Sequence, residues 1–448
     1  MHARYARAVT PNTALEKTLG PLALWGLGVG YVISGEYFGW NLGLPLAGTY
    51  GMLAATLVVT LMYATFVPSY AELACAMPQA GGAFVYATRA FGPLVGSVAG
   101  FAQAIEFVFA PPAIAMAIAA YVAQRLPSLD PRLVAALAYL TFTGLNAWGV
   151  RQAARFELVV TVLAVAELLL FVAVALPSFD ARAFSVDPLP HGWSGAFHGL
   201  PFAIWFYLAI EGLANAAEEA KNPQRDVALG FAASMATLGV LAILVFFASV
   251  GVAGWEAVVY PPGSTEPSDA PLPLALGHLV GRGSILYSLL LGVGLLGLVA
   301  SFHGILLAAA RATMALGRAG LAPELLGAVH VGSATPRVAL AVNLVLGLVA
   351  ILTGRTAEII TLSCFGALVL YLLSMLAFFR LRATEPDLER PFRAPFHPFF
   401  PGIALVLSAV CLVSLAVDQP RIAGVFLVLL GGSTLYARSR IRAGTATR

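Results

Sequence analysis

The sequence predicts an all-α integral membrane protein with twelve transmembrane helices. Three observations support this: the composition, the spacing of long apolar stretches, and the distribution of basic residues between them. Hydrophobic residues make up 60% of the 448 residues and charged residues 10%, whereas a soluble domain carries about 25% charged residues. The net charge of +3 is too small to indicate a nucleic-acid partner, so the lipid bilayer is the expected surrounding.

Each predicted helix is a stretch of roughly 17–25 mostly apolar residues, the length that crosses a hydrocarbon core about 30 Å thick. The first 18 residues contain no apolar signal-peptide core, so we expect the first span to direct membrane insertion. The predicted spans are residues 21–46, 48–75, 92–122, 132–149, 156–177, 196–219, 228–252, 284–312, 337–353, 356–380, 400–417 and 421–437.

The basic residues predict the orientation of these spans. An even number of spans puts both termini on one side, and Lys and Arg favour the cytoplasmic side. With a cytoplasmic N-terminus, 19 of the 25 Lys and Arg residues lie inside. We therefore expect cytoplasmic tails at 1–20 and 438–448, in a multi-pass protein of the cell (inner) membrane. The six outside are Arg125, Arg132, Arg182, Arg282, Arg355 and Arg421.

The cysteines give no sign of a metal site or a disulfide framework. Cys75, Cys364 and Cys411 lie in or at the ends of apolar spans without metal-ligand spacing. We expect three buried thiols and no cofactor.

Four acids lie near half depth in their spans: Glu36, Glu106, Glu167 and Glu211. No Lys or Arg lies in the interior of any span, so these acids must be protonated, hydrogen-bonded, or neutralised by an external cation. Any one of them could be a protonated structural bridge between helices. Four together favour a site for a cationic substrate, a proton, or both.

Two spans carry a glutamate beside a glycine, at residues 34–36 in the first and 209–212 in the sixth. Glycine there could simply allow close helix packing. Interrupted helices at equivalent places in two repeats, however, indicate the binding site of a transporter, because unwound backbone at mid-membrane must line a cavity.

Three long motifs resemble the amino acid, polyamine and organocation transporter superfamily. They are Tyr70–Leu73 (YAEL) with Met77–Tyr86 (MPQAGGAFVY), Glu218–Asp226 (EEAKNPQRD), and Arg311–Pro323 (RATMALGRAGLAP). They occur in the order expected for that superfamily, and the resemblance covers roughly residues 20–380. Each motif lies at a cytoplasmic helix end, where we expect it to close the inner gate rather than touch substrate.

The resemblance implies a five-plus-five inverted repeat of the LeuT type, with helices 1–5 in residues 21–177 and helices 6–10 in residues 196–380. Helices 11 and 12, residues 400–437, would be peripheral. It also implies that the broken helices 1 and 6 hold the substrate, with help from helices 3, 8 and 10.

The first helix departs from the amino acid carriers of the superfamily, whose motif there usually reads Gly-Ser-Gly-Ile-Phe. Here the residues are Ile33 to Tyr37, with Glu36 where the substrate carboxylate would approach. In a desolvated site, Glu36 would repel that carboxylate. The run from Ile33 to Asn41, together with Glu106-Phe107 and Ala209–Gly212, resembles the ethanolamine permease branch.

From this resemblance we expect a substrate pocket that pairs an ammonium group with carboxylates and aromatic faces. Trp205 matches the aromatic gate of helix 6, although core packing also explains it and Tyr37. Related proton-coupled carriers often have a lysine midway along helix 5, and the alignment puts Glu167 there, so Glu167 and Glu211 are the candidate proton-linked groups. The expected substrate-binding residues are Ser34, Gly35, Glu36, Tyr37, Gln103, Glu106, Trp205, Glu211 and Ser301.

The predicted function is uptake of a small amine, ethanolamine first, by alternating access. Uniport, proton symport and exchange all fit, and so do a cationic amino acid, a polyamine or choline as substrate. A nutrient sensor is a more distant alternative. An enzyme is not expected, because the chain has no paired metal ligands, nucleophile elbow or phosphate loop. The spans do not indicate an oligomeric state.

Overall fold

The computed structural model of the chain describes residues 17–79, 81–148, 153–330 and 335–444. Much of the predicted tails, at 1–16 and 445–448, lies outside these ranges, as does Arg151. All named elements in the described residues are helices, which confirms the all-α prediction there. They are α2 (Pro21–Val32), α3 (Ser34–Tyr37), η1 (Trp40–Gly43), α4 (Leu44–Ala76), α5 (Ala83–Phe91), α6 (Pro93–Ala123), α7 (Pro131–Trp148), α8 (Ala153–Ala175), η2 (Leu176–Ser178), α9 (Ala181–Phe184), α10 (Gly195–Trp205), η3 (Ile210–Glu219), α11 (Pro223–Ala253), α12 (Trp255–Val259), α13 (Pro271–Val280), α14 (Ile285–Arg318), η4 (Glu324–Gly327), α15 (Arg337–Thr353), α16 (Thr356–Thr384), α17 (Phe399–Asp418) and α18 (Pro420–Arg442).

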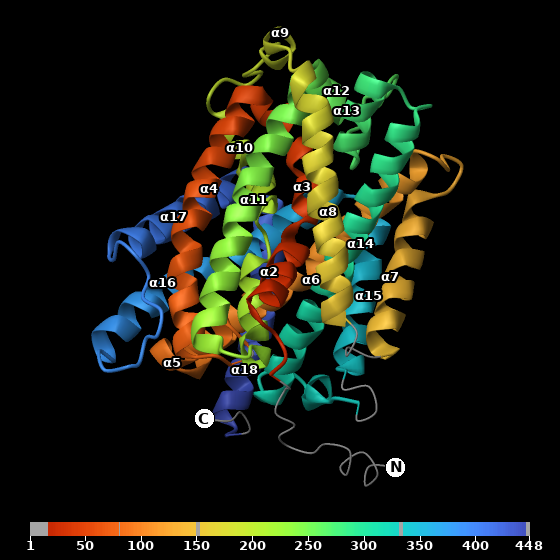
Figure 1. Cartoon of the computed structure of the whole chain (residues 1–448). Coiled ribbons are helices and arrows are strands. Elements are labelled where there is room, and N and C mark those ends of the chain that lie inside the picture. Colours follow the sequence, from red (N-terminus) through yellow and green to blue (C-terminus); the bar gives the residue numbers. More distant parts are fainter. Residues whose placement is uncertain (1–16, 80, 149–152, 331–334, 445–448) are drawn as a thin grey trace.

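The long helices run along one axis of the molecule and form a single bundle (Figure 1). Within the described residues, nine helices are long and apolar enough to cross a membrane. Shorter or less apolar helices, α2, α7 and α15, occupy three of the predicted spans. The protein is therefore built as a multi-pass membrane protein, while the exact count of twelve spans stays a prediction.

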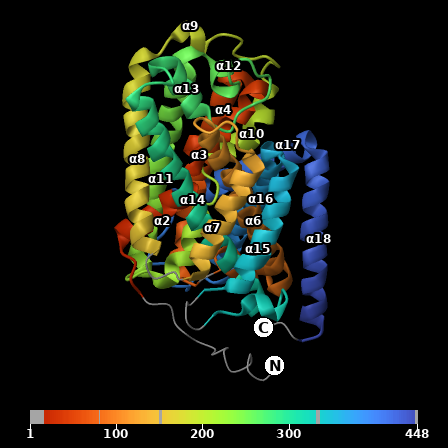
Figure 2. The ribbon, with the colours of Figure 1, turned by 90° about the vertical axis from the view of Figure 1, so that its right-hand side faces the viewer.

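Two helices stand at the edge of this bundle. Figure 2 shows α17 and α18 beside the other helices rather than among them. Only 28% of the most apolar stretch of α17 is buried inside the protein, and only 11% of that of α18. Their valine- and leucine-rich faces are therefore left for lipid.

Helix 1 is broken, but not where the sequence prediction put the break. Ser34, Gly35 and Glu36 remain helical in the short α3, and the chain becomes extended at Phe38 and turns at Gly39. Gly39 has φ +93°, a conformation that residues with a Cβ rarely adopt. The predicted break at 34–36 is thus displaced toward the C-terminus, because Gly39 supplies the conformational freedom and Gly35 does not use it.

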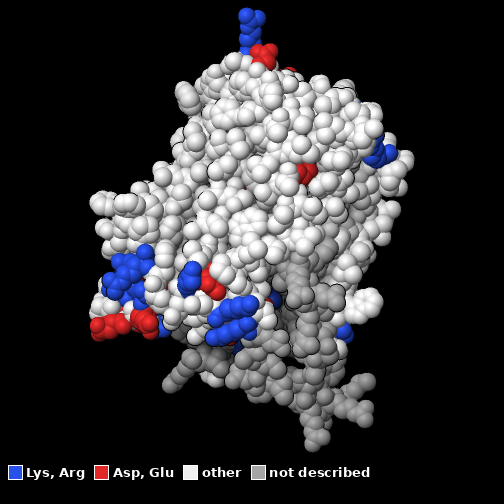
Figure 3. Space-filling view, viewed as in Figure 1, with Lys and Arg blue, Asp and Glu red and all other residues white. Residues whose placement is uncertain are grey.

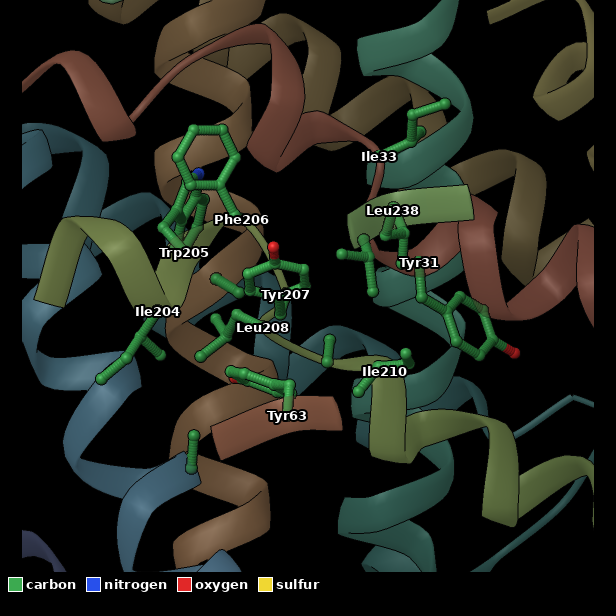
Figure 4. Packing of buried hydrophobic residues seen from close by; sticks show 14 of the residues in the cluster. Tyr31, Ile33, Tyr63, Ile204, Trp205, Phe206, Tyr207, Leu208, Ile210 and Leu238 are labelled. Carbon is green, nitrogen blue, oxygen red and sulfur yellow. The ribbon is translucent and has the colours of Figure 1, made fainter. Parts of the chain in front are cut away.

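Helix 6 breaks at the predicted place. Its first half, α10, ends at Trp205, and Ala209 adopts a left-handed conformation with φ +78°. The chain then continues as a ten-residue 3₁₀ helix, η3, although such helices rarely exceed three or four residues. Figure 4 shows the unwound segment with Phe206, Tyr207 and Leu208 between the two halves.

The charged residues mark the two ends of the bundle. Figure 3 shows a broad uncharged belt, with most visible Lys and Arg gathered at the lower end. Helix α2 begins at this end and α18 ends there (Figures 1 and 2). Cys75, Cys364 and Cys411 are free and buried, as predicted.

Candidate functional site

The breaks in helices 1 and 6 lie directly against each other. A Cβ on Gly35 would collide with the carbonyl oxygen of Trp205 and lie 3.0 Å from the Cα of Phe206. A Cβ on Gly39 would collide with the indole ring of Trp205, and Phe38 packs edge-on against that ring at 5.4 Å. The two glycines therefore let the interrupted segments touch through backbone, and Trp205 covers the break in helix 1.

Helix α14, the eighth predicted span, contacts α2 and α3 of the first span through two of the predicted site residues. The Ser301 hydroxyl lies 2.9 Å from the Ser34 hydroxyl and donates to the Tyr31 carbonyl at 3.0 Å. Ser34 and Trp205 also line a cavity of about 10 Å³ between α2, α3, α6, α10 and α14. A space of this size holds about one water molecule. The site is closed in this conformation and must open to admit a substrate.

Glu106 of α6 and Glu211 of η3 form a carboxyl pair. The two side chains are fully buried and lie side by side, and neither oxygen of Glu106 nor Oε1 of Glu211 accepts a hydrogen bond from a donor among the described residues. Tyr371 of α16 donates to Glu211 Oε2 at 2.9 Å, and its own hydroxyl lies 2.8 Å from that of Tyr63. Among the described residues, neither carboxyl group forms an ion pair with Lys or Arg. The pair can therefore hold a proton or a cation.

Gln103 lies one turn before Glu106 on α6. Its side chain is buried, and its Nε2 has no hydrogen-bond partner among the described residues. A buried amide donor without a partner is costly. It supplies a free polar group on the same helix as the carboxyl pair.

Glu36 stands apart from the carboxyl pair. It is fully buried, and within the described part of the chain neither carboxyl oxygen has a hydrogen-bond partner. Its ionisable neighbours are Tyr37 and Tyr207. The expected three-acid pocket is thus divided, with Glu106 and Glu211 in contact and Glu36 nearer the unwound part of helix 6.

Glu167 of α8 is linked to the break in helix 1 through Tyr37. The Tyr37 hydroxyl donates to Glu167 Oε2 at 2.6 Å and lies 3.1 Å from the Ala164 carbonyl. Tyr121 of α6 donates to the Tyr37 carbonyl at 3.2 Å. A change in the charge of Glu167 would therefore act directly on the short helix that carries Glu36.

The sequence analysis did not single out another buried acid, Glu157. Glu157 lies in α8 and faces α2 and α14. Its carboxylate occupies the space beside Gly30 and Gly304, and Oε2 is 3.7 Å from His303 Nδ1. It also missed the tyrosines that surround the carboxyl pair. Tyrosine is common in apolar helices, so the only usable signal was the absence of a basic partner for Glu211.

Each of the three sequence motifs contributes to an ion pair at the lower end of the bundle. Glu72 of the first motif is buried, and it accepts from Arg382 Nε at 2.9 Å and lies 3.3 Å from Arg390 Nε. Glu219 of the second motif pairs with Arg311 of the third at 2.8 Å. These contacts link the end of α4 to that of α16 and the end of η3 to α14, and they close this side of the bundle.

A larger groove, of about 680 Å³, lies away from the breaks, between α10 and α17. Most of its lining is apolar, and a contact between the His198 ring and the Asp418 carboxylate lies at one side of it. Exposed valines of α17 form one wall. Its position on the outer face of the bundle fits contact with lipid rather than with a transported solute.

The described residues bring no three His, Cys, Asp or Glu side chains together as a metal site. The polar groups at the breaks are carboxyl, hydroxyl, amide and aromatic groups. This chemistry suits binding of a small organic cation without covalent steps.

Comparison with known proteins shows the family. The family described as amino acid permease matches residues 19–431. An uncharacterized transporter of Rhizobium meliloti is 31% identical over 411 residues, covering 89% of this chain and 85% of that protein. A branched-chain amino acid permease of Bacillus subtilis is 26% identical, covering 91% and 90%. A methylthioribose transporter of the same species is 26% identical, covering 90% and 89%.

Proposed function

The chain belongs to the amino acid permease family, and we propose that it imports a small cationic amine, ethanolamine first, through the cell membrane by alternating access. Its relatives are named as transporters and permeases, which supports transport rather than catalysis. One of them is named for methylthioribose, so the relatives are not all named for amino acids.

The observation that carries this proposal is the set of buried acids at the two helix breaks. Glu36, Glu106 and Glu211 are fully buried, and none forms an ion pair with a described Lys or Arg. Whichever of these acids ionises to pair with an ammonium group would repel the carboxylate of an amino acid in a desolvated site. An amine without a carboxylate would instead be attracted.

We assign the following roles within this site. Glu106 and Glu211 would hold the ammonium group, and Glu36 would add negative charge from the break in helix 1. Trp205 would cover the amine with its aromatic face, a contact worth about 0.5–2 kcal/mol. The remaining proposed binding residues are Ser34, Gly35, Tyr37, Gln103 and Ser301, whose hydroxyl, amide and backbone groups suit the alcohol of the substrate.

The architecture that we propose around the site is a five-plus-five inverted repeat, residues 21–177 and 196–380, with residues 400–437 peripheral. The helix breaks at corresponding places in the two halves support it, and so does the edge position of α17 and α18 (Figure 2). The excess of Lys and Arg on the side of the termini supports cytoplasmic tails in an inner-membrane protein.

Alternating access requires that the contacts closing each side of the site separate in turn. The Glu219–Arg311 and Glu72–Arg382 pairs hold the cytoplasmic side closed, and the cavity beside Ser34 and Trp205 has room for only one water. Opening outward would move α10 and Trp205 away from helix 1. Opening inward would separate Glu219 from Arg311.

Proton coupling is the finer part of the proposal. Glu167 contacts helix 1 through Tyr37, and Glu211 lies in the carboxyl pair, so either could transmit a change of protonation to a helix break. The proposal therefore keeps both acids as candidates for the proton-linked group.

A cationic amino acid, a polyamine or choline would also satisfy buried acids, and a non-transporting nutrient sensor is the more distant alternative. Uptake of radiolabelled ethanolamine into liposomes that contain the purified protein separates these readings. We expect uptake that excess unlabelled ethanolamine abolishes and excess leucine leaves unchanged. Strong competition by neutral amino acids would defeat the amine proposal, and binding without uptake would favour a sensor.

A further inference from the structure

We infer that the Glu106–Glu211 pair holds protons when no substrate is bound, and that each ammonium group displaces one of them. The protein would then exchange an amine for a proton instead of carrying both in the same direction. This inference rests on the proposed function, because it assigns the amine to the same two carboxyl groups.

The contact between the two acids is the first step. Glu106 comes from α6 and Glu211 from η3; both side chains are fully buried and lie side by side, and neither Glu106 oxygen nor Glu211 Oε1 accepts a hydrogen bond from a donor among the described residues. Two buried carboxylates side by side repel each other, so at least one proton must lie between them while the site is empty. Tyr371 donates to Glu211 Oε2 and holds that carboxyl group in place.

The second step concerns the other groups that face the pair. The titratable neighbours are Tyr63 and Tyr70 of α4, and Tyr371 and Cys364 of α16. None of these side chains carries a positive charge. Neutralisation of the pair in the described structure therefore depends on protons.

The third step is conservation of charge. A buried site tolerates little net charge, because an isolated ion loses its hydration without compensation. The empty pair is neutral when both acids are protonated. An ammonium group that enters keeps the site neutral if one proton leaves, as N–H⋯O⁻ contacts replace O–H⋯O contacts. The bound state then holds one proton and one ammonium group.

This exchange sets the direction of coupling. A proton leaves toward the side from which the amine arrives, and another is taken up on the side where the amine departs. One turnover therefore moves one positive charge each way. An alkaline outside and an acidic inside would drive uptake, which is the opposite of the gradient that drives proton symport.

Proton release can be counted directly with the purified full-length protein in detergent. Isothermal titration with ethanolamine, in two buffers of different ionisation enthalpy at pH 7, gives the number of protons released per amine bound. We expect about one, with the apparent Kd for ethanolamine rising about tenfold for each unit of pH lost. Binding without proton release, or with proton uptake, would overturn the inference and leave the amine proposal standing. If no ethanolamine bound in either buffer, the proposed function would fail and the inference with it.

Two variants locate the proton. Glu157→Gln removes a buried acid outside the pair and should leave the count at about one per amine. Glu106→Gln with Glu211→Gln should abolish both proton release and amine binding. Proton release that is lost in Glu157→Gln, or kept in the double variant, would overturn the assignment to the pair.

Vesicles test the direction. Uptake of ethanolamine at zero membrane potential should rise severalfold when the vesicle interior is made acidic. Neutral ethanolamine also diffuses into acidic vesicles and is trapped there, so vesicles that contain the double variant supply the baseline. Stimulation by an acidic exterior instead would overturn the exchange.

Discussion

Glu72 at the lower end of the bundle and Glu211 at its middle are both buried, but their charges are neutralised differently. Glu72 is 1% exposed and contacts both Arg382 and Arg390. Glu211 is fully buried and contacts another acid and a tyrosine. Arginine balances the first carboxylate within the protein, whereas the second depends on a proton or a ligand.

This difference separates a structural role from a functional one. An ion pair inside a protein holds elements together but offers nothing to a solute, because each charge already has its partner. An acid at mid-membrane without a basic partner is expensive, and such residues usually mark substrate or proton sites. The ion pairs of Glu72 at the lower end therefore form a clasp that holds helix ends together, whereas the acids at the middle form a site that a cation completes.

Removing a carboxylate from the clasp should have the largest effect on folding. Glu72→Gln would leave Arg382 and Arg390 without their buried counter-charge, and loss of one member of a buried pair costs roughly 3–5 kcal/mol. Thermal unfolding of the purified protein in detergent checks this. Glu358→Gln, which breaks an exposed pair with Arg355, is the matched control and should change little. Equal stability of the two variants would remove the distinction between the regions.

Removing a carboxylate from the middle should spare folding and impair binding. Glu211→Gln deletes no ion pair, so the unfolding temperature should stay or rise. Amine affinity should fall by about 2–5 kcal/mol, roughly thirtyfold or more, because the ammonium group loses a desolvated partner. Equilibrium binding of radiolabelled ethanolamine measures this. A destabilised variant with normal affinity would show that Glu211 is structural.

The contact between the two breaks should be sensitive to a single methyl group. A Cβ on Gly35 would meet the backbone of Trp205 and Phe206, which has little freedom to move. We expect Gly35→Ala to cost about 1–3 kcal/mol of stability, as overpacking does elsewhere, and to slow transport. Gly144, a helical glycine of α7 whose added Cβ would meet nothing within 4 Å, supplies the matched control in Gly144→Ala, which should not destabilise the protein. If Gly35→Ala transports normally, the breaks do not need this close contact.

The smallest effect concerns an exposed ion pair, Arg89–Glu385. The Arg89 guanidinium, through its hydrogen bonds, lowers the pKa of Glu385. The pair therefore contributes stability above the ordinary pKa of a glutamate, and this contribution is lost as the pH falls through the lowered pKa. Because both side chains are well exposed, Arg89→Gln should cost only a few tenths of a kcal/mol at pH 7. That difference in unfolding temperature should shrink as the pH falls and vanish once Glu385 is protonated in the folded protein; a difference that does not shrink as the pH falls would rule out the ion pair as its source.

Apolar length alone carried much of the fold prediction. The span predicted at 337–353 matches α15 residue for residue, and the span at 92–122 differs from α6 by one residue at each end. The break in helix 6 was also predicted, because a glutamate beside a glycine is so unusual at mid-membrane. The position of a residue along the axis of a spanning helix can be counted from the sequence.

Direction around a helix axis was harder to predict. Glu36, Glu106 and Glu211 share a depth, yet only the last two meet, because their contact depends on how α6 and η3 are rotated. Glu157 is the second residue of the span predicted at 156–177, whereas α8 begins earlier, at Ala153. Gly30 and Gly304 leave space for its carboxylate. The tyrosines around Glu211 come from helices far apart in the sequence, so no local sequence pattern predicts that they lie near Glu211.

The most direct test of the central claim is equilibrium binding of radiolabelled ethanolamine to the purified protein, with leucine as competitor. The account predicts saturable binding that excess leucine does not displace, and its loss when Glu106 and Glu211 are both replaced by Gln. Displacement by leucine, or unchanged ethanolamine binding in the double variant, would contradict a site that selects an amine without a carboxylate.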